Sequence, residues 1–575
     1  MEGLPDLVLQ QIFQQVIDFR SLEYFEDPDF LGTWGLWADM ILPLLHVCRE
    51  WRRLSLPSYY QFAAYSYFDL SNYKVRALWK KARLREIRDP ALVRMVKHVY
   101  MHVYIRELLC DGLAGTLSAL GDQVFAGVTQ LVIVVESREY IFDDRIEPAT
   151  ARETNTPPRP IDSALTREAV QQINWASYRL HEMFPNIRAV DVSSTSRTSA
   201  PLSVAKLCCE LMQNKVALSV APTACIEVVA PMVHTPELQW IRVDLMDRCR
   251  QALELVRRNA ATLQTLIFTN ARAHCVGAIL HDADGEPLVY GQLRVLRLGL
   301  LEPQLPCAEL AAFTAFPQLK RVACTPCDPH IAPAVLRPGM ERLTSLRMFL
   351  SGASVRRLCS DGVLDACELP ALRHIELLRP ADSSGADNGA GSMGERDLLQ
   401  LALWALRVGH HCLSIVLSSW RIRLPWLQYA PPLLEALAHV HGTLRSLELP
   451  LACSVSQALA MAARFPHLSR FGVPLTLAQN KPCTGYELRN LRELCVAVSG
   501  AREEHDVALA CELAAQVTQA QRLVYHVEHE GVPDQAHELH VGDVIAAELE
   551  SERFGQHAHL AQLDVQSRGP DPRWL

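Results

Sequence analysis

The most regular feature of this chain is a short apolar phrase with the spacing L-x-x-L-x-L. Its clearest copy runs from Leu293 through Leu296 to Leu298. The last two leucines are two positions apart, so in an extended strand they share one face, and Arg297 between them belongs to the opposite face. A strand with only two or three buried side chains cannot form a core alone. The phrase therefore predicts strands that stack against copies of one another.

Further copies of the phrase follow along most of the chain. Seven good copies begin at Ile187, Leu238, Leu263, Leu343, Leu372, Leu444 and Leu491, and six weaker ones begin at Val96, Val128, Leu319, Cys412, Leu468 and Leu560. With 49% of the chain hydrophobic, three positions match the phrase by chance about one time in eight. The spacing between copies therefore has to decide whether they form a repeat. From Leu238 to Leu372 successive copies start 24 to 30 residues apart. That near-constant interval indicates one structural unit per copy.

A proline often stands just before the phrase. Four copies share the order apolar residue, proline, any residue, aliphatic residue, at Phe184-Pro185, Phe316-Pro317, Leu369-Pro370 and Phe465-Pro466. Proline cannot continue a helix, and it favours extended geometry in the residue before it. The segments upstream have helical spacing: Leu253 to Arg258, Ala308 to Phe313, Leu398 to Val408, Leu433 to Val440 and Val455 to Phe465. Each unit is therefore predicted to hold a helix and a strand.

Over residues 96–575 this order resembles the leucine-rich repeat proteins. The resemblance implies an α/β repeat solenoid, an irregular horseshoe with parallel strands on its concave face. The family's asparagine, three residues after the strand's last leucine, is mostly absent, since Leu301, Ser351 and Ala452 stand there. We expect variable curvature for that reason. Segments 143–162 and 381–394, poor in apolar residues, are expected to be flexible insertions in the array, and 281–287 a turn.

The first 57 residues carry a different pattern. Leu4-Pro5 with Ile12-Phe13, and the stretch V-C-R-x-W-R-R-L from Val47 to Leu54, resemble an F-box, a small all-α helical module. In that family the module docks on the Skp-type adaptor of a cullin-RING ubiquitin ligase. The resemblance implies an adaptor-binding apolar face made by Leu4, Pro5, Ile12, Val47, Cys48 and Trp51.

The middle of this module departs from the family. Ile12 and Val47 lie 35 positions apart, about twice the family's spacing, and the acidic and aromatic segment 20–37 is expected to be an insertion. Loop insertions cost little closure entropy, about 0.6 kcal/mol per doubling of length. An alternative stays open, in which these helices only cap the repeat core. Residues 58–95 are expected to form an aromatic and basic bridging segment, whose basic run is predicted to be a solvated helix face.

Charge and composition narrow the class of protein. A formal net charge of -8 argues against a dedicated nucleic-acid binder. No secretory pattern and no uninterrupted apolar run of about 18 residues is present, so we expect no membrane span. The 17 scattered cysteines fit free thiols in a reducing compartment. The expected location is cytoplasmic, nuclear or both.

Candidate chemistry is sparse. Cys324 and Cys327, with His330, have metal-ligand spacing, but a zinc site needs four ligands and no second C-x-x-C completes it. Asp282 and Asp284 begin a calcium-type loop that lacks its distal glutamate. The carboxy-terminal histidines, such as His537 and His540, are not spaced as H-E-x-x-H. We expect neither a metal, a cofactor nor an enzymatic activity.

The predicted function is recognition. By the resemblance, the chain would be the substrate-recognition subunit of a cullin-RING ubiquitin ligase, binding a target protein through the repeat array. The residues expected to face the target are Arg294, Arg297, Arg373, Glu376, Arg445 and Glu448. Their mixed charge suits a protein ligand better than a phosphate backbone. The alternative is a non-catalytic interaction scaffold.

Overall fold

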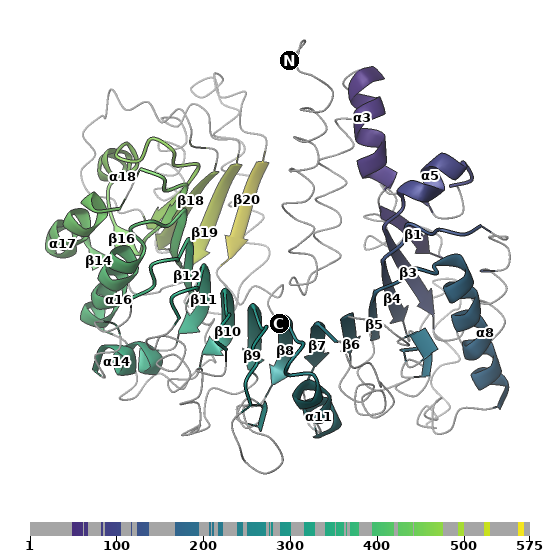
Figure 1. Ribbon diagram of the computed structural model, residues 1–575. Coiled ribbons are helices and arrows are strands. Elements are labelled where there is room, and N and C mark those ends of the chain that lie inside the picture. Colours follow the sequence, from purple (N-terminus) through teal and green to yellow (C-terminus); the bar gives the residue numbers. More distant parts are fainter. Residues whose placement is uncertain are drawn as a thin grey trace, which may run out of the picture. The chain divides into compact units, whose positions relative to one another are not determined.

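The structure is a computed structural model of the whole chain. It describes residues 49–60, 62–66, 82–83, 87–104, 117, 123–136, 167–194, 206–208, 210–211, 217–221, 238–244, 250–271, 275, 278–279, 288–300, 316–327, 340–350, 352–360, 364, 368–378, 394–418, 424–440, 442–474, 491, 493–499, 522–528 and 562–567. The chain divides into two compact units, Met1–Ala271 and Arg272–Leu575, here called unit 1 and unit 2. Each is an α/β unit built on parallel strands (Figure 1).

The sheet of unit 1 is a single parallel row. Its strands are β1 (Phe62–Ser66), β2 (Ala82–Arg83), β3 (His98–Tyr104), β4 (Gln130–Glu136), β5 (Ala189–Ser194), β6 (Ala217–Ala221), β7 (Trp240–Asp244) and β8 (Thr265–Ala271). β1 pairs with β2 and β3, and from β3 onward each strand pairs with the next one in the chain. Parallel neighbours need a crossover between them, which is where the helices lie.

Four helices are described in unit 1: α3 (Arg49–Tyr60), α5 (Pro90–Met95), α8 (Arg167–Met183) and α11 (Arg250–Arg258). Asp89 caps α5, since its Oδ1 accepts the Ala91 N–H at 2.8 Å, and Pro90 stands at the first helical position, where proline is tolerated. In α11 the residues Ala252, Leu253, Leu255 and Val256 are buried, so one stripe of the helix faces the core.

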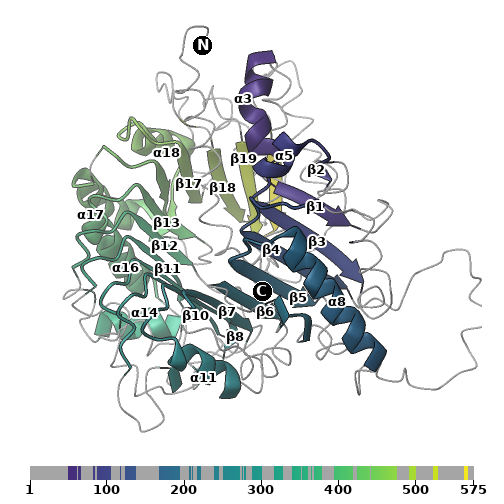
Figure 2. The same ribbon diagram turned by 45° about the vertical axis from the view of Figure 1, so that its right-hand side comes forward.

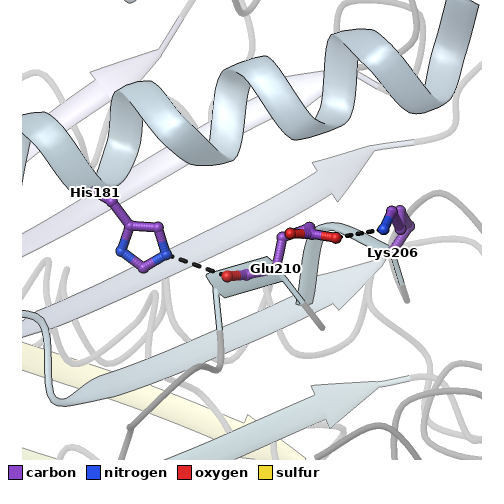
Figure 3. A network of polar contacts seen from close by, with 3 residues as sticks. All are labelled: His181, Lys206 and Glu210. Carbon is purple, nitrogen blue, oxygen red and sulfur yellow. Dashed lines mark hydrogen bonds and ion pairs between the residues drawn. The ribbon is translucent and has the colours of Figure 1, made fainter.

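Polar contacts join α8 to the helical residues that follow β5 in the chain (Figure 3). His181, in the last turn of α8, has Nε2 3.1 Å from the backbone oxygen of Glu210. A carbonyl can only accept, so Nε2 carries the hydrogen. The Glu210 carboxylate pairs with Lys206 one turn earlier. This link ties one crossover helix to the next.

Unit 2 repeats the same plan. Its main strands are β9 (Val295–Leu300), β10 (Arg321–Cys327), β11 (Ser345–Leu350), β12 (His374–Leu378), β13 (Ser414–Ser418), β15 (Ser446–Glu448), β17 (Arg470–Pro474), β18 (Glu493–Ser499), β19 (Arg522–Glu528) and β20 (Gln562–Ser567). They pair in this order and all in parallel. The short strands β14 (Leu424–Pro425) and β16 (Leu451–Ala452) form a separate parallel pair.

The described helices of unit 2 lie on one face of its strands (Figures 1 and 2). They are α14 (Gly352–Ser360), α16 (Glu395–Val408), α17 (Trp426–Ala438) and α18 (Val455–Ala462). α16 contacts α14 and α17 on either side as well as β13 beneath it. At the start of α18, Ser454 and Gln457 make a reciprocal capping box, which supplies partners for two backbone N–H groups.

The pairing register aligns the apolar phrase across the strands of unit 2. The phrase's second apolar residue is Leu296, Val322, Leu346, Ile375, Ile415, Leu447 and Phe471 in successive strands, and these residues are register partners. Each of the seven is at most 2% exposed. One apolar row therefore runs across the strands, and each side chain is covered by its neighbours in the row and by the helix layer.

The turn before each strand explains the proline pattern. The apolar residues Phe184, Phe316, Leu369 and Phe465 are all buried. The carbonyl of each of these residues accepts a hydrogen bond from the N–H three positions later, at 3.0 to 3.3 Å. The residue that donates this N–H is the first residue of the phrase. Equivalent rings of successive copies also touch: the Phe125 and Phe184 centroids are 5.7 Å apart, and those of Tyr290 and Phe316 are 5.3 Å apart. The residue before the proline is therefore a second stacked core position.

Most of the expected strands and helices have an observed counterpart. Every copy of the phrase coincides with a strand, and four of the five expected helical segments fall on α11, α16, α17 and α18. The fifth, Ala308 to Phe313, lies outside the described residues, as do 20–37, 143–162 and 281–287 and all of 381–394 except Gly394. β1 and β2 lie within the expected bridge 58–95, so the row of strands begins before Val96. None of the helices in the described ranges has the length and apolar character of a membrane span.

Gly409, which ends α16, provides a test of this packing. A Cβ there would come within 2.5 Å of the Ala405 backbone oxygen and 2.8 Å of Ile415 Cδ1. We predict that Gly409→Ala lowers the free energy of unfolding by about 1–3 kcal/mol, because a packed core resists extra atoms. Urea denaturation followed by circular dichroism measures it. Gly442→Ala is the matched control, since a Cβ there has no atom within 4 Å, and it should change stability by less than about 1 kcal/mol. Equal losses in both variants would contradict the stacked arrangement.

Candidate protein-binding face

The candidate adaptor residues fall at the beginning of the described chain. Trp51 lies in α3 and is half-buried. Leu4, Pro5, Ile12, Val47 and Cys48 lie outside the described residues. On α3, Leu54 and Ser55 are buried, and the Ser55 hydroxyl donates to the Trp51 carbonyl at 2.6 Å. α3 contacts α5 and β1, so this helix packs on the start of the strand row of unit 1.

The candidate target residues are positioned by strand alternation. Ile375 and Ile415 point toward the end of α16, since their Cδ1 atoms are the ones that a Cβ on Gly409 would meet. The residue one position further along each strand points the opposite way. In successive strands that residue is Arg297, Ala323, Arg347, Glu376, Val416 and Glu448, and these are register partners. The side away from the helices therefore carries a row of charged residues, with arginines on β9 and β11 and glutamates on β12 and β15.

This charged face, as we call it, consists of Arg297, Arg321, Arg347, His374, Glu376, Glu448 and Arg470. Its clearest contact joins two neighbouring strands: Arg347 Nε lies 3.0 Å from Glu376 Oε2. The Arg347 guanidinium also lies over the Phe349 ring, 5.7 Å from its centroid. Both side chains are partly exposed, so the pair contributes about 0.2–1 kcal/mol to stability and chiefly fixes the position of the guanidinium.

Glu448 is held differently from the other predicted target residues. Only 4% of it is exposed, and its Oε2 lies 3.5 Å from Arg470 Nη2 on the adjacent strand. Sequence reasoning placed Glu448 on the ligand side together with Glu376. The structure agrees on the side of the strand, but a buried and paired carboxylate offers a ligand almost no surface. Glu448 is better described as the group that positions Arg470.

His374 is the titratable group at the centre of the charged face. Burial lowers the pKa of His374 below its usual value, and the nearby Arg321 guanidinium lowers it further. The imidazole is therefore neutral at pH 7, and the positive charge of the face comes from arginine alone. Sequence reasoning missed Arg347, which takes the same position in its copy as Arg297. It also missed Arg321, His374 and Arg470, each of which opens a strand one position before the phrase's second apolar residue. Reading that position in every copy would have found them.

The other three predicted target residues form a separate row. Arg294, Arg373 and Arg445 stand just before β9, β12 and β15, and all three are exposed. Their backbones continue the ladder, since Arg294 O accepts the Lys320 N–H at 2.8 Å and Arg373 O accepts the Leu413 N–H at 2.7 Å. These arginines therefore lie at the edge where the strands begin. Arg297 and Glu376 lie on the strand face itself and are half-buried.

The C-x-x-C segment is structural where it is described. Cys324 lies in β10 between its register partners Leu298 and Met348, and its side chain is fully buried, while His330 lies outside the described residues. No group of three metal-ligating side chains occurs within the described part of the chain. Asp282, Asp284, His537 and His540 also fall outside it.

The ionisation of two buried cysteine thiols indicates whether they are reactive. Burial raises the pKa of Cys412 to about 12, with a smaller opposing effect of Arg373. Burial likewise raises the pKa of Cys453. A thiol is nucleophilic only as the thiolate, so these two cysteines are inert core residues. Among the described groups the arrangement supports binding and offers no activated nucleophile of this kind.

Comparisons with known proteins add little. No protein-family model matches the chain, and no curated protein matches it. A solved structure of a Bacteroides fragilis protein from a structural genomics consortium overlaps 58% of this chain and 67% of its own, at 10% identity and a TM-score of 0.23. A similarity that loose carries no argument about either fold or function.

His98 of unit 1 provides a pH test. Burial lowers the pKa of His98 to about 4, against a smaller opposing effect of its hydrogen bond, in which Nδ1 lies 2.7 Å from Gln130 Oε1. In the unfolded chain the His98 imidazole takes up a proton near pH 6.5, but in the folded chain it does so only near pH 4. Protonation therefore favours the unfolded chain. The stability that comes from a neutral His98 is complete above pH 6.5 and is lost as pH falls toward 4. We predict that the free energy of unfolding drops by about 2 kcal/mol more between pH 7.5 and 5.0 in the wild type than in His98→Gln.

Urea titrations at both pH values measure this difference. The exposed His467 is the matched control, and His467→Gln should keep the full pH dependence of the wild type. An unchanged pH dependence in His98→Gln would show that the imidazole of His98 is solvated in the folded protein.

Proposed function

We propose that this chain is the substrate-recognition subunit of a cullin-RING ubiquitin ligase. Its amino-terminal module would be F-box-like and would dock a Skp-type adaptor. The two rows of strands would be an irregular leucine-rich repeat array that holds a target protein. The ligase chemistry would then belong to other subunits.

One observation carries the proposal. The motif V-C-R-x-W-R-R-L, from Val47 to Leu54, ends in a helix that packs against the first strands of a parallel row. From Leu238 to Leu372, a stretch that runs through both units, successive apolar copies start 24 to 30 residues apart, at or close to the interval of leucine-rich repeats. An adaptor-docking helix joined directly to a binding array is the arrangement that a substrate receptor needs. The row of charges on the array is of the kind that gives protein interfaces their specificity.

Adaptor docking can be tested by co-purification of the full-length chain with a Skp-type adaptor. We predict that Val47→Asp with Trp51→Ala reduces the recovered adaptor at least about thirtyfold, as expected for the loss of a buried tryptophan anchor worth about 2 kcal/mol or more. Trp175→Ala is the control, because Trp175 on α8 is 42% exposed and its truncation removes a similar side chain from unit 1. It should bind like the wild type.

Thermal unfolding of all three proteins separates lost docking from lost folding. If the wild type recovers only background adaptor, or if the double variant recovers as much as Trp175→Ala, docking through this motif is wrong.

A second candidate, an interaction scaffold, is favoured by a specific contact. Because Leu54 and Ser55 are buried and α3 packs on β1, the amino-terminal helices could serve only to cover the end of the array. α3 runs through the expected module boundary at residue 57, so a deletion should stop before it. If the segment is a cap, removing residues 1–48 lowers the unfolding temperature by several degrees and increases binding of an apolar dye. If it is a docking module, the temperature stays within about 2 °C.

A further inference from the structure

The edge of unit 2 where its strands begin is strongly basic. Five exposed cations lie in the short turns that enter β9 to β15, and we call them the basic edge: Arg294, Lys320, Arg342, Arg373 and Arg445. The turn residues concerned are 291–294, 317–320, 341–344, 370–373, 410–413 and 442–445, and Glu341 is the one acidic residue among them. The chain as a whole has a formal net charge of -8. Positive charge is therefore concentrated here against the overall balance.

The backbone arranges four of these cations in one line. From Arg294 to Arg445 each turn donates an N–H to the carbonyl of the turn before it, at 2.7 to 2.8 Å, through Lys320, Thr344, Arg373 and Leu413. Each step is one strand spacing, about 4.8 Å, so the line from Arg294 to Arg445 spans about 24 Å. Side-chain bonds stiffen it, since the Thr344 hydroxyl donates to Lys320 O at 3.0 Å.

The side chains of two residues of the basic edge are held along this line by hydrogen bonds to neighbouring turns. Arg373 Nη1 donates to the His411 carbonyl of the following turn at 3.1 Å, and Arg342 Nη1 donates to Gln318 Oε1 of the preceding turn. A guanidinium has five N–H donors, so each has more donors than the one used in this contact. The turns of unit 1 at the same place are less charged, with Lys97, Thr129, Arg188, Gln239 and Gln264 in the equivalent position. The charge is therefore a property of unit 2 rather than of the strand-turn geometry.

We propose that the basic edge binds an extended, acidic segment of the target protein, an inference that rests on the proposed target-binding role of unit 2. An extended peptide advances about 3.3 Å per residue, so roughly seven residues cover the line. Alternate side chains of such a peptide lie about 6.6 Å apart on one side, within reach of the long arginine and lysine stems. Guanidinium groups bind carboxylates in a two-pronged geometry, which favours Asp and Glu as the recognised residues.

A nucleic acid fits the edge less well. Duplex DNA carries one phosphate charge per about 1.7 Å, and a chain with net charge -8 repels so dense a polyanion outside the edge itself. A short acidic segment carries far less charge and can lie within the edge. Recognition should weaken with salt, because exposed charges are screened beyond about 10 Å at 0.1 M ionic strength.

The test is fluorescence anisotropy of the full-length chain with a labelled ten-residue peptide of alternating Glu and Ser. A Gln–Ser peptide of the same length and a single-stranded DNA oligonucleotide are the comparison probes. We expect the Glu–Ser peptide to bind and to lose roughly tenfold in affinity between 50 and 300 mM NaCl, and the Gln–Ser peptide not to bind. The variant Arg294→Glu with Arg373→Glu and Arg445→Glu should weaken binding of the Glu–Ser peptide at least about tenfold.

A matched control changes the same net charge elsewhere. Arg167, Arg188 and Arg250 are exposed in unit 1, and Arg188 occupies the equivalent turn position. Replacing all three by Glu should leave peptide binding within about twofold of the wild type. Equal losses in the two triple variants would mean that overall charge, and not the edge, attracts the peptide. The proposal is also overturned if the Glu–Ser peptide does not bind. It is overturned as well if the oligonucleotide binds more tightly than the peptide and the edge variant loses that binding.

Adaptor recovery from the same preparations separates this inference from the proposed function. If the edge variant and the wild type recover adaptor equally while neither binds the peptide, the acidic-segment inference fails and the ligase role stands. If the peptide binds at the edge while the wild type recovers no adaptor, the ligase role fails and the edge remains a binding site for acidic segments.

Discussion

The backbone pairing between each strand and the next is the interaction on which the rest of the structure depends. A single copy of the phrase has two or three apolar side chains, and alone it would leave half of their surface in water. Parallel pairing in register places Leu346 beside Ile375, and Ile375 beside Ile415, so that each covers the next. Burying each such side chain contributes about 1.5–3 kcal/mol, but only when both neighbours are present. Stability is therefore shared between copies rather than held within one.

The same register creates the candidate binding surfaces. Because alternation sends every second residue away from the helices, the residues between the apolar positions line up as well. That alignment brings Arg347 to within 3.0 Å of Glu376, although the two are 29 positions apart in the chain. It also sets the turn cations Arg294, Lys320 and Arg373 along one edge. A protein built this way gains an extended charged surface directly from its core pattern.

Much of this arrangement could be read from the sequence. The phrase predicted the strands because period-two apolar spacing and a proline-marked turn recur together. It missed β1, β2, β6 and β19, where the aligned positions hold Ala63, Ala82, Lys215 and Tyr525 in place of a larger aliphatic residue. Ala63 is nevertheless fully buried, since burial there depends on the neighbouring strand, which a single-copy pattern does not include. α17 also begins earlier than expected, passing through Pro431 and Pro432.

The positions of the candidate target residues on the strands could be predicted from the sequence only in part. Sequence reasoning grouped all the charged residues of the phrase on one surface. The structure separates them, with Arg445 exposed in a turn and Glu448 buried beneath Arg470 only three positions later. The pairing partner of a charge lies on another strand, and its distance follows from register, which the spacing of one copy does not reveal. The division into two units after Ala271 likewise depends on contacts between copies.

Disulfide trapping measures the register directly. Ser345 and His374 are partners on adjacent strands, so their Cα atoms should lie about 4.8 Å apart, within the range that a disulfide spans. Glu376 is on the same face of the same strand but two residues out of register, about 7–8 Å from Ser345. In-register pairing predicts that Ser345→Cys with His374→Cys oxidises to an intramolecular disulfide, detected by mass spectrometry, while Ser345→Cys with Glu376→Cys does not. Equal yields from the two pairs, or a higher yield from the second, would contradict the shared apolar row.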